Sequence, residues 1–160
     1  MEELRDKTCF FCGHRDISEE KLAALQERLA KTVEDLIGKG VFYFGVGGGV
    51  GFDNLAALTV LKLKRRYPQI RLAVVLPCKE HDFSWQGLDK EPLEKVLRQA
   101  DRVMYTAERY SNGCMYKRNR QLAESSGVCV CYLERDTGGT AYAVSYAQSV
   151  GAQVVNLALE

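Results

Sequence analysis

The stretch VFYFGVGGGVGFD, residues 41–53, contains the pattern that decides the fold. Val41–Val46 is a short apolar run rich in β-branched and aromatic residues, which predicts a buried strand. A glycine-rich loop follows, and from Gly51 to Tyr67 the leucines recur at helical spacing. A strand, a glycine loop and a helix in this order are typical of an α/β fold with a parallel sheet.

The same alternation extends from this unit toward both ends of the chain. The expected strands are Thr8–Phe11, Val41–Val46, Ile70–Leu76, Arg102–Thr106, Val128–Leu133 and Ala152–Leu157. Helices are expected from the N-cap Ser18 to Gly38, over Gly51–Tyr67, from Pro92 onward, over Asn112–Ser126 and over Thr140–Val150. Strands that are apolar on both faces indicate a mostly parallel sheet covered on both sides. With right-handed crossovers, we predict a Rossmann-like α/β three-layer sandwich of about six strands.

Length and composition restrict the classes of protein to which the chain can belong. The 160 residues suffice for a single domain, residues 1–160, and 46% apolar with 27% charged residues is an ordinary globular balance. A net charge of +1 argues against nucleic acid or anionic lipid as a partner. The N-terminal MEELRDKTCFF lacks the apolar segment of a signal peptide, and no run reaches the roughly 18 apolar residues of a membrane span. We therefore expect a cytoplasmic protein without membrane contact.

Six cysteines allow two interpretations, a disulfide framework or reduced thiols. Without a secretion signal, reduced thiols are favoured. Cys9 and Cys12 have a metal-like spacing, but no second pair with matching spacing follows, so we expect no metal. Cys129 and Cys131 alternate within an apolar run, which predicts that both thiols face the same side of a strand.

The parallel sheet predicts where a ligand binds, because every strand-to-helix loop emerges at the carboxyl edge. In the loop of residues 47–53, Gly47, Gly48 and Gly49 let backbone N–H groups approach a ligand. The loop has neither the G-x-G-x-x-G register nor a P-loop lysine. Asp53 suits ribose hydroxyls or an amine better than a phosphate. The alternative is a tight turn in which Asp53 only caps the helix.

A second loop of the same design precedes the last expected helix. Gly138, Gly139 and Thr140 offer two flexible positions and a hydroxyl at a helix N-terminus, which suits a phosphate. The alternative is a flexible turn whose threonine serves as an N-cap. Two such loops on one edge favour a ligand site.

Polar residues from other segments are expected at the same edge. Gly13, His14 and Arg15 directly follow the first strand, where Arg15 can bind a phosphate and His14 can donate, stack or serve a structural role. Arg118 and Asn119 share a helix face with Met115, which predicts either a ligand clamp or a helix–helix salt bridge. Trp85 is expected to stack on a base, close the cleft or contact a second copy.

The motifs taken together resemble a known family. In chain order they are TCFFCGHR at residues 8–15, the loop of residues 47–53 followed by Ala56, Leu76-Pro77-Cys78 with Trp85, YKRNR at 116–120, and GGTAY at 138–142 followed by Tyr146-Ala147. Over nearly its whole length the chain resembles the YpsA/YoqJ-like proteins of the SLOG superfamily, which is related to DprA and LOG proteins. This resemblance implies a Rossmann-like domain that binds a nucleotide or nucleotide derivative.

The resemblance also bears on catalysis. LOG proteins hydrolyse the N-glycosidic bond of nucleoside monophosphates with a PGGxGTxxE segment. Here Gly139-Thr140 match its Gly-Thr, but the glutamate position falls at Ala143 and the leading proline is absent. We therefore expect a nucleotide-binding or sensing protein that needs no cofactor and forms a homodimer. The alternative is a nucleotide-processing enzyme in which Asp53 or His14 replaces the glutamate.

Overall fold

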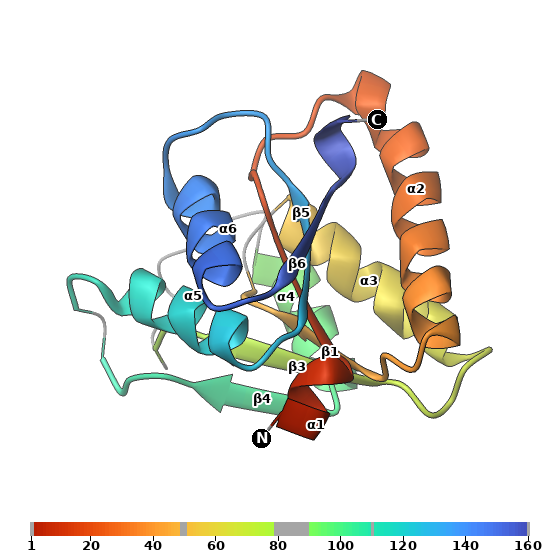
Figure 1. The fold of residues 1–160 in the computed structure, drawn as a ribbon, viewed down its shortest axis with the longest axis horizontal. Coiled ribbons are helices and arrows are strands. Elements are labelled where there is room, and N and C mark those ends of the chain that lie inside the picture. Colours follow the sequence, from red (N-terminus) through yellow and green to blue (C-terminus); the bar gives the residue numbers. More distant parts are fainter. Residues whose placement is uncertain (1, 49–50, 79–89, 110, 160) are drawn as a thin grey trace.

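The central sheet is the framework of the computed structural model, which describes residues 2–48, 51–78, 90–109 and 111–159. Within these residues six strands pair in parallel in the order β4-β3-β2-β1-β5-β6 (Figure 1). The strands are β1 (Thr8–Gly13), β2 (Tyr43–Val46), β3 (Arg71–Leu76), β4 (Arg102–Tyr105), β5 (Val128–Tyr132) and β6 (Gln153–Asn156). The predicted Rossmann-like α/β arrangement with a parallel sheet is confirmed.

The helices follow the strands as expected, with boundaries that differ by a few residues. They are α2 (Glu19–Gly38), α3 (Phe52–Lys64), α4 (Lys90–Gln99), α5 (Cys114–Glu124) and α6 (Gly139–Ser149). Two short elements were not predicted, namely α1 (Glu2–Asp6) and the 3-10 turn Leu157–Leu159. Gly49 and Trp85, to which the sequence assigned possible ligand contacts, lie outside the described residues.

The helices form two layers on opposite faces of the sheet. On one face α3 packs against α2 and α4, and on the other α5 packs against α6 (Figure 1). Alternation along β1 serves both layers, because Cys9 and Phe11 join the core beneath α2 and α3 while Phe10 and Cys12 join the core beneath α6. The central strand β1 is therefore buried on both sides, as its apolar run predicted, whereas the edge strands β4 and β6 are only partly buried.

The strand order reverses next to β1, and this reversal determines where a ligand can enter. The chain proceeds from β1 outward through β2 and β3 to β4, then crosses back to place β5 on the other side of β1. At the carboxyl ends of the two neighbours, Cys12 pairs with Cys131 and Gly13 with Tyr132. The segments that follow β1 and β5 lead away to opposite sides, which opens a crevice between them.

The thiols belong to the core. All six cysteines are buried and free, and Cys129 and Cys131 lie in the same core cluster as Cys12, on one face as predicted. Burial raises the pKa of the Cys9 thiol, so it stays protonated at neutral pH.

Among the described residues no group of histidine, cysteine or carboxylate side chains is arranged to hold a metal ion. Nor does any helix in that part of the chain combine the length and apolar character that crossing a bilayer requires.

Candidate functional site

A cavity of about 470 Å³ lies at the carboxyl ends of β1 and β5, where the strand order reverses. Nine of the residues that the sequence predicted as ligand contacts line it, namely Gly13, His14, Arg15, Asp53, Arg118, Asn119, Gly138, Gly139 and Thr140. It is also lined by Asp16, Arg135 and Thr137, to which the sequence assigned no role. The fold thus brings together residues from the segments after β1 and β5 and from α3, α5 and α6.

The described glycines of the loop before α3 pack against other parts of the chain. Neither Gly47 nor Gly48 lines the cavity, so their contact with a ligand stays a prediction. A Cβ at Gly47 would lie 2.4 Å from the Arg118 guanidinium. Gly51 has a φ of +73°, and a Cβ there would lie 2.3 Å from the carbonyl oxygen of Arg15. The glycines at positions 47 and 51 therefore allow α5 and the segment after β1 to approach this loop closely.

Arg118 is a buried cation at the inner wall of the cavity, with only 6% of its surface exposed. Its guanidinium donates to the carbonyl oxygen of Gly47 and to the Asn119 side-chain oxygen, the latter at 2.8 Å. Burial lowers the pKa of Arg118, while the negative charge of Asp53 opposes that shift. These contacts bind α5 to the loop before α3 and set the position of the guanidinium without any ligand.

His14 connects three parts of the site. It is 5% exposed, its carbonyl accepts from the Phe52 N–H at 3.2 Å, and its Nε2 accepts from the backbone N–H of Glu134 at 2.8 Å. An Nε2 that accepts a hydrogen bond belongs to a neutral ring with its proton on Nδ1. Burial, together with the positive charge of Arg135, lowers the pKa of His14. His14 therefore holds the ends of β1 and β5 together as a neutral side chain.

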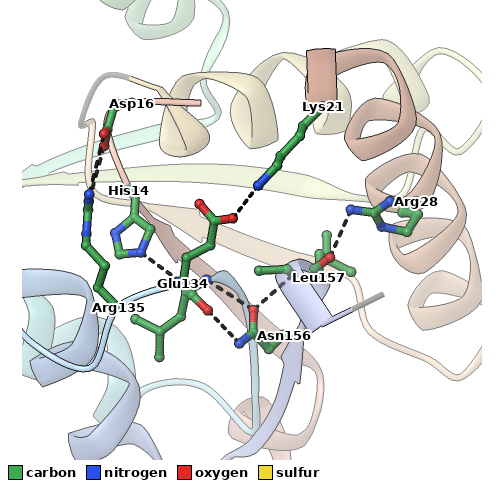
Figure 2. Close-up of polar contacts among 10 residues, drawn as sticks. His14, Asp16, Lys21, Arg28, Glu134, Arg135, Asn156 and Leu157 are labelled. Carbon is green, nitrogen blue, oxygen red and sulfur yellow. Dashed lines mark hydrogen bonds and ion pairs between the residues drawn. The ribbon is translucent and has the colours of Figure 1, made fainter. Parts of the chain in front are cut away.

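Two ion pairs join the segments after β1 and β5 (Figure 2), and the residues of one of them, Asp16 and Arg135, line the cavity. The guanidinium of Arg135 donates to both carboxylate oxygens of Asp16, at 3.2 and 3.4 Å. Lys21 donates to Glu134 at 2.7 Å. The Arg135 guanidinium holds the pKa of the Asp16 carboxyl below its usual value. Sequence reasoning missed Arg135, although a cation shortly after a strand, as Arg15 is after β1, is a signal that could have found it.

The base of the segment after β5 is fixed by Asn156 of β6. The Asn156 side chain accepts from the Leu133 N–H at 3.1 Å and donates to the Leu133 carbonyl at 3.0 Å (Figure 2). Together with the His14 bond to Glu134, these contacts hold the backbone immediately before Arg135. The Arg135 side chain therefore extends from an ordered support.

The N-terminus of α6 faces the cavity with open space beside it. Gly138 is the N-cap, with φ 95°, and a Cβ at Gly138 or Gly139 would meet nothing within 4 Å. The first N–H groups of a helix have no partner within the helix, and its dipole favours a negative charge there. Ala143, where the resemblance to LOG proteins places their catalytic glutamate, lines the same cavity. The arrangement offers anion binding and lacks that carboxylate.

A second cavity, of about 600 Å³, lies on the other side of α5. Its walls include Tyr116, Lys117, Arg120 and Tyr142, which we call the Tyr116 surface. The Tyr116 ring is 45% exposed and meets Tyr142 edge to face at a centroid distance of 4.7 Å. Arg120 is half-buried and donates to the Tyr142 hydroxyl at 3.1 Å.

Two solved structures of DNA processing protein A have a similar fold. One, from Helicobacter pylori and described for its single-stranded DNA binding mode, has a TM-score of 0.69 at 17% identity, over 95% of this chain and 66% of its own. The other, from Streptococcus pneumoniae, has a TM-score of 0.67 at 14% identity, over 92% of this chain and 48% of its own. The chain thus spans about two thirds of the first protein and about half of the second.

The sequence relatives are matched over a larger share of their own length than the two solved structures are. The UPF0398 protein BH1768 of Halalkalibacterium halodurans is 32% identical over 142 residues, which are 87% of this chain and 72% of that protein. The prophage-derived protein YoqJ of Bacillus subtilis strain 168 is 28% identical over 137 residues, 78% of this chain and 80% of YoqJ. The model of the YpsA family, described as a SLOG family, matches residues 12–156. The chain therefore belongs to the YpsA family of SLOG proteins.

Proposed function

We propose that the chain binds a nucleotide or nucleotide derivative in the 470 Å³ cavity and acts as a binding or sensing protein. The observation that carries the proposal is the open N-terminus of α6 facing the same cavity as the exposed guanidinium of Arg135. Backbone N–H donors, a helix dipole and an arginine fork all favour a phosphate group. The cavity volume lies in the range typical of small-molecule sites, about 300–1,000 Å³.

The other lining residues suit the rest of a nucleotide. The Thr140 hydroxyl lies in the first turn of α6 and adds a donor for the phosphate. The carboxylate of Asp53 is a ligand for ribose hydroxyls, and the amide of Asn119 can contact a base edge. No metal or cofactor takes part in this proposal.

Binding is favoured over catalysis by the acid–base groups of the cavity. General acid–base catalysis requires a side chain that can exchange a proton with the substrate near the working pH. The Nε2 atom of His14 already accepts the Glu134 N–H, and Asp16 is paired with Arg135. Asp53 remains the candidate if the chain is instead an enzyme that cleaves the N-glycosidic bond.

The test is a thermal-shift titration with the four common nucleoside monophosphates. We expect at least one of them to raise the melting temperature, because a ligand that binds only the folded state stabilises it. Gly139→Asp places a carboxylate at the phosphate position and abolishes the shift, whereas Ser145→Asp adds the same charge on the exposed face of α6 and retains it. If the wild type releases free base and Asp53→Asn does not, the binding proposal is overturned and the chain is an enzyme that cleaves the N-glycosidic bond.

A second candidate is single-stranded nucleic acid bound along the Tyr116 surface. An exposed tyrosine beside Lys117 and Arg120 offers base stacking and phosphate contacts together, which a net charge of +1 does not reveal. Fluorescence anisotropy with a labelled oligothymidine tests it. Binding that Tyr116→Ala weakens supports this candidate, and no binding at low salt excludes it.

The expected homodimer also stays a proposal, since Trp85 lies outside the described residues.

A further inference from the structure

We propose that Arg135 makes the cavity selective for ligands that carry a phosphate group, and that Asp16 occupies Arg135 until such a ligand displaces it. The proposal rests on the nucleotide binding proposed above and specifies the ligand class. Nucleoside monophosphates bind, and the corresponding nucleosides bind much more weakly. Asp16 acts as an internal competitor for the phosphate.

The position of Arg135 allows it to contact a ligand at the N-terminus of α6. The chain runs from Arg135 through Thr137 to the N-cap Gly138, and all three line the cavity. The guanidinium presents two N–H groups to the Asp16 carboxylate, at 3.2 and 3.4 Å. A phosphate can accept the same pair of hydrogen bonds, because its oxygens match the arginine fork as a carboxylate does.

A phosphate can replace Asp16 as the partner of Arg135 at little cost in stability. The two side chains are 56% and 75% exposed, and an ion pair with that exposure adds little to stability. A phosphate dianion carries more charge than Asp16 and also gains the N–H donors of α6. Arg118 differs, because it is buried and its guanidinium is held by Gly47 and Asn119. Of these two cations, Arg135 is therefore the one that can exchange its partner.

His14 reports on the state of Arg135. Its pKa is lowered by burial and by the charge of Arg135, while the carboxylates of Asp16 and Glu134 act in the opposite direction. When a phosphate neutralises the charge of Arg135, protonation of the neutral His14 ring to the imidazolium becomes more favourable. We therefore expect the imidazole NMR titration of His14 to move to higher pH when a nucleoside monophosphate is bound, and also in Arg135→Gln without ligand.

The experiment compares affinities for the four nucleoside monophosphates and their nucleosides by isothermal titration calorimetry. Arg135→Gln weakens nucleoside monophosphate binding by about tenfold or more, the range expected for a lost charge-assisted hydrogen bond, and leaves nucleoside binding unchanged. Asp16→Asn tightens nucleoside monophosphate binding several-fold by removing the competitor. The matched control is Lys21→Gln, since the Lys21–Glu134 pair joins the same two segments without lining the cavity.

Each outcome has a distinct meaning. If wild type and Arg135→Gln bind nucleoside monophosphates equally, the role of Arg135 is refuted while the proposed function stands. If Asp16→Asn weakens binding, Asp16 is part of the site and not a competitor. If no nucleoside monophosphate binds even the wild type, the proposed function itself is overturned. If the titration of His14 is the same in Arg135→Gln as in the wild type, the proposed electrostatic link between Arg135 and His14 is refuted.

Discussion

The two glycine-rich loops of the molecule look alike in sequence and differ in what surrounds them. In the loop of residues 47–51, a Cβ at Gly47 would collide with Arg118 and one at Gly51 with the backbone of Arg15. In the loop of residues 136–140, a Cβ at Gly138 or Gly139 would meet nothing within 4 Å. The described glycines of the first loop let other parts of the chain pack closely against the loop, whereas the glycines of the second loop leave open space beside a helix N-terminus. The second loop is therefore the stronger candidate for contact with a ligand.

The largest expected effect distinguishes the two loops by stability. Gly51→Ala forces a side chain into a positive-φ position against the Arg15 carbonyl, and we expect the free energy of unfolding to fall by about 3 kcal/mol. Gly139→Ala meets no neighbour, so its free energy of unfolding stays within about 0.5 kcal/mol of the wild type. Urea unfolding curves measure both. Equal losses in the two variants would remove the distinction.

A smaller effect separates the two arginines next to these loops, Arg118 of α5 beside the first and Arg135 just before the second. Arg118→Met deprives the Gly47 carbonyl of its donor and Asp53 of a nearby cation in a buried setting. We expect a loss of about 2 kcal/mol in the free energy of unfolding, because removing one partner leaves buried polar groups unsatisfied. Arg135→Gln changes an exposed pair, and its free energy of unfolding stays within about 0.5 kcal/mol of the wild type. A larger loss in Arg135→Gln than in Arg118→Met would reverse the assignment of roles.

The smallest effect concerns His14, which lies between the two loops and bonds to Phe52 after the first and Glu134 before the second. The pKa of His14 is lowered in the folded chain, whereas the unfolded chain titrates near the ordinary value of about 6.5. Just below that value the unfolded state binds more protons, so the contribution of His14 to stability rises with pH across this window.

The measurement is the melting temperature of wild type and His14→Gln between pH 5 and pH 8. We expect the difference between them to grow as the pH rises, because only the neutral ring of His14 accepts the Glu134 N–H. His81 is present in both proteins and cancels. A difference that is constant over the pH range contradicts a neutral, bonded His14.

Much of the fold could be predicted because hydrophobic periodicity is a local property. The run VCVCY of β5 and the leucines of α3 specify their elements without reference to the rest of the chain. The helix α1 was missed because five residues carry no apolar period; its Arg5 side chain donates to the carbonyl of Val150 at the other end of the sequence. The extension of β1 to Gly13 depends on pairing with Tyr132, which no local pattern reveals.

The site could be predicted only in part, for the same reason. The rule that loops meet at the carboxyl edge of a parallel sheet brought together the segments after β1 and β5. The rule does not say which glycine contacts a side chain of the same protein, as Gly47 contacts Arg118. Nor does it say which cation is already held by a carboxylate, as Arg135 is by Asp16. These are tertiary contacts, and they separate the packed loop from the open one.

We propose that the phosphate of a nucleotide binds at the second glycine loop. The most direct measurement is a backbone amide NMR titration of the wild-type chain with a nucleoside monophosphate that stabilises it. We expect the amide signals of Gly138, Gly139 and Thr140 to move most, because the N–H groups of these residues contact the phosphate. Large shifts at Gly47 and Gly48, with those three signals unmoved, would contradict it.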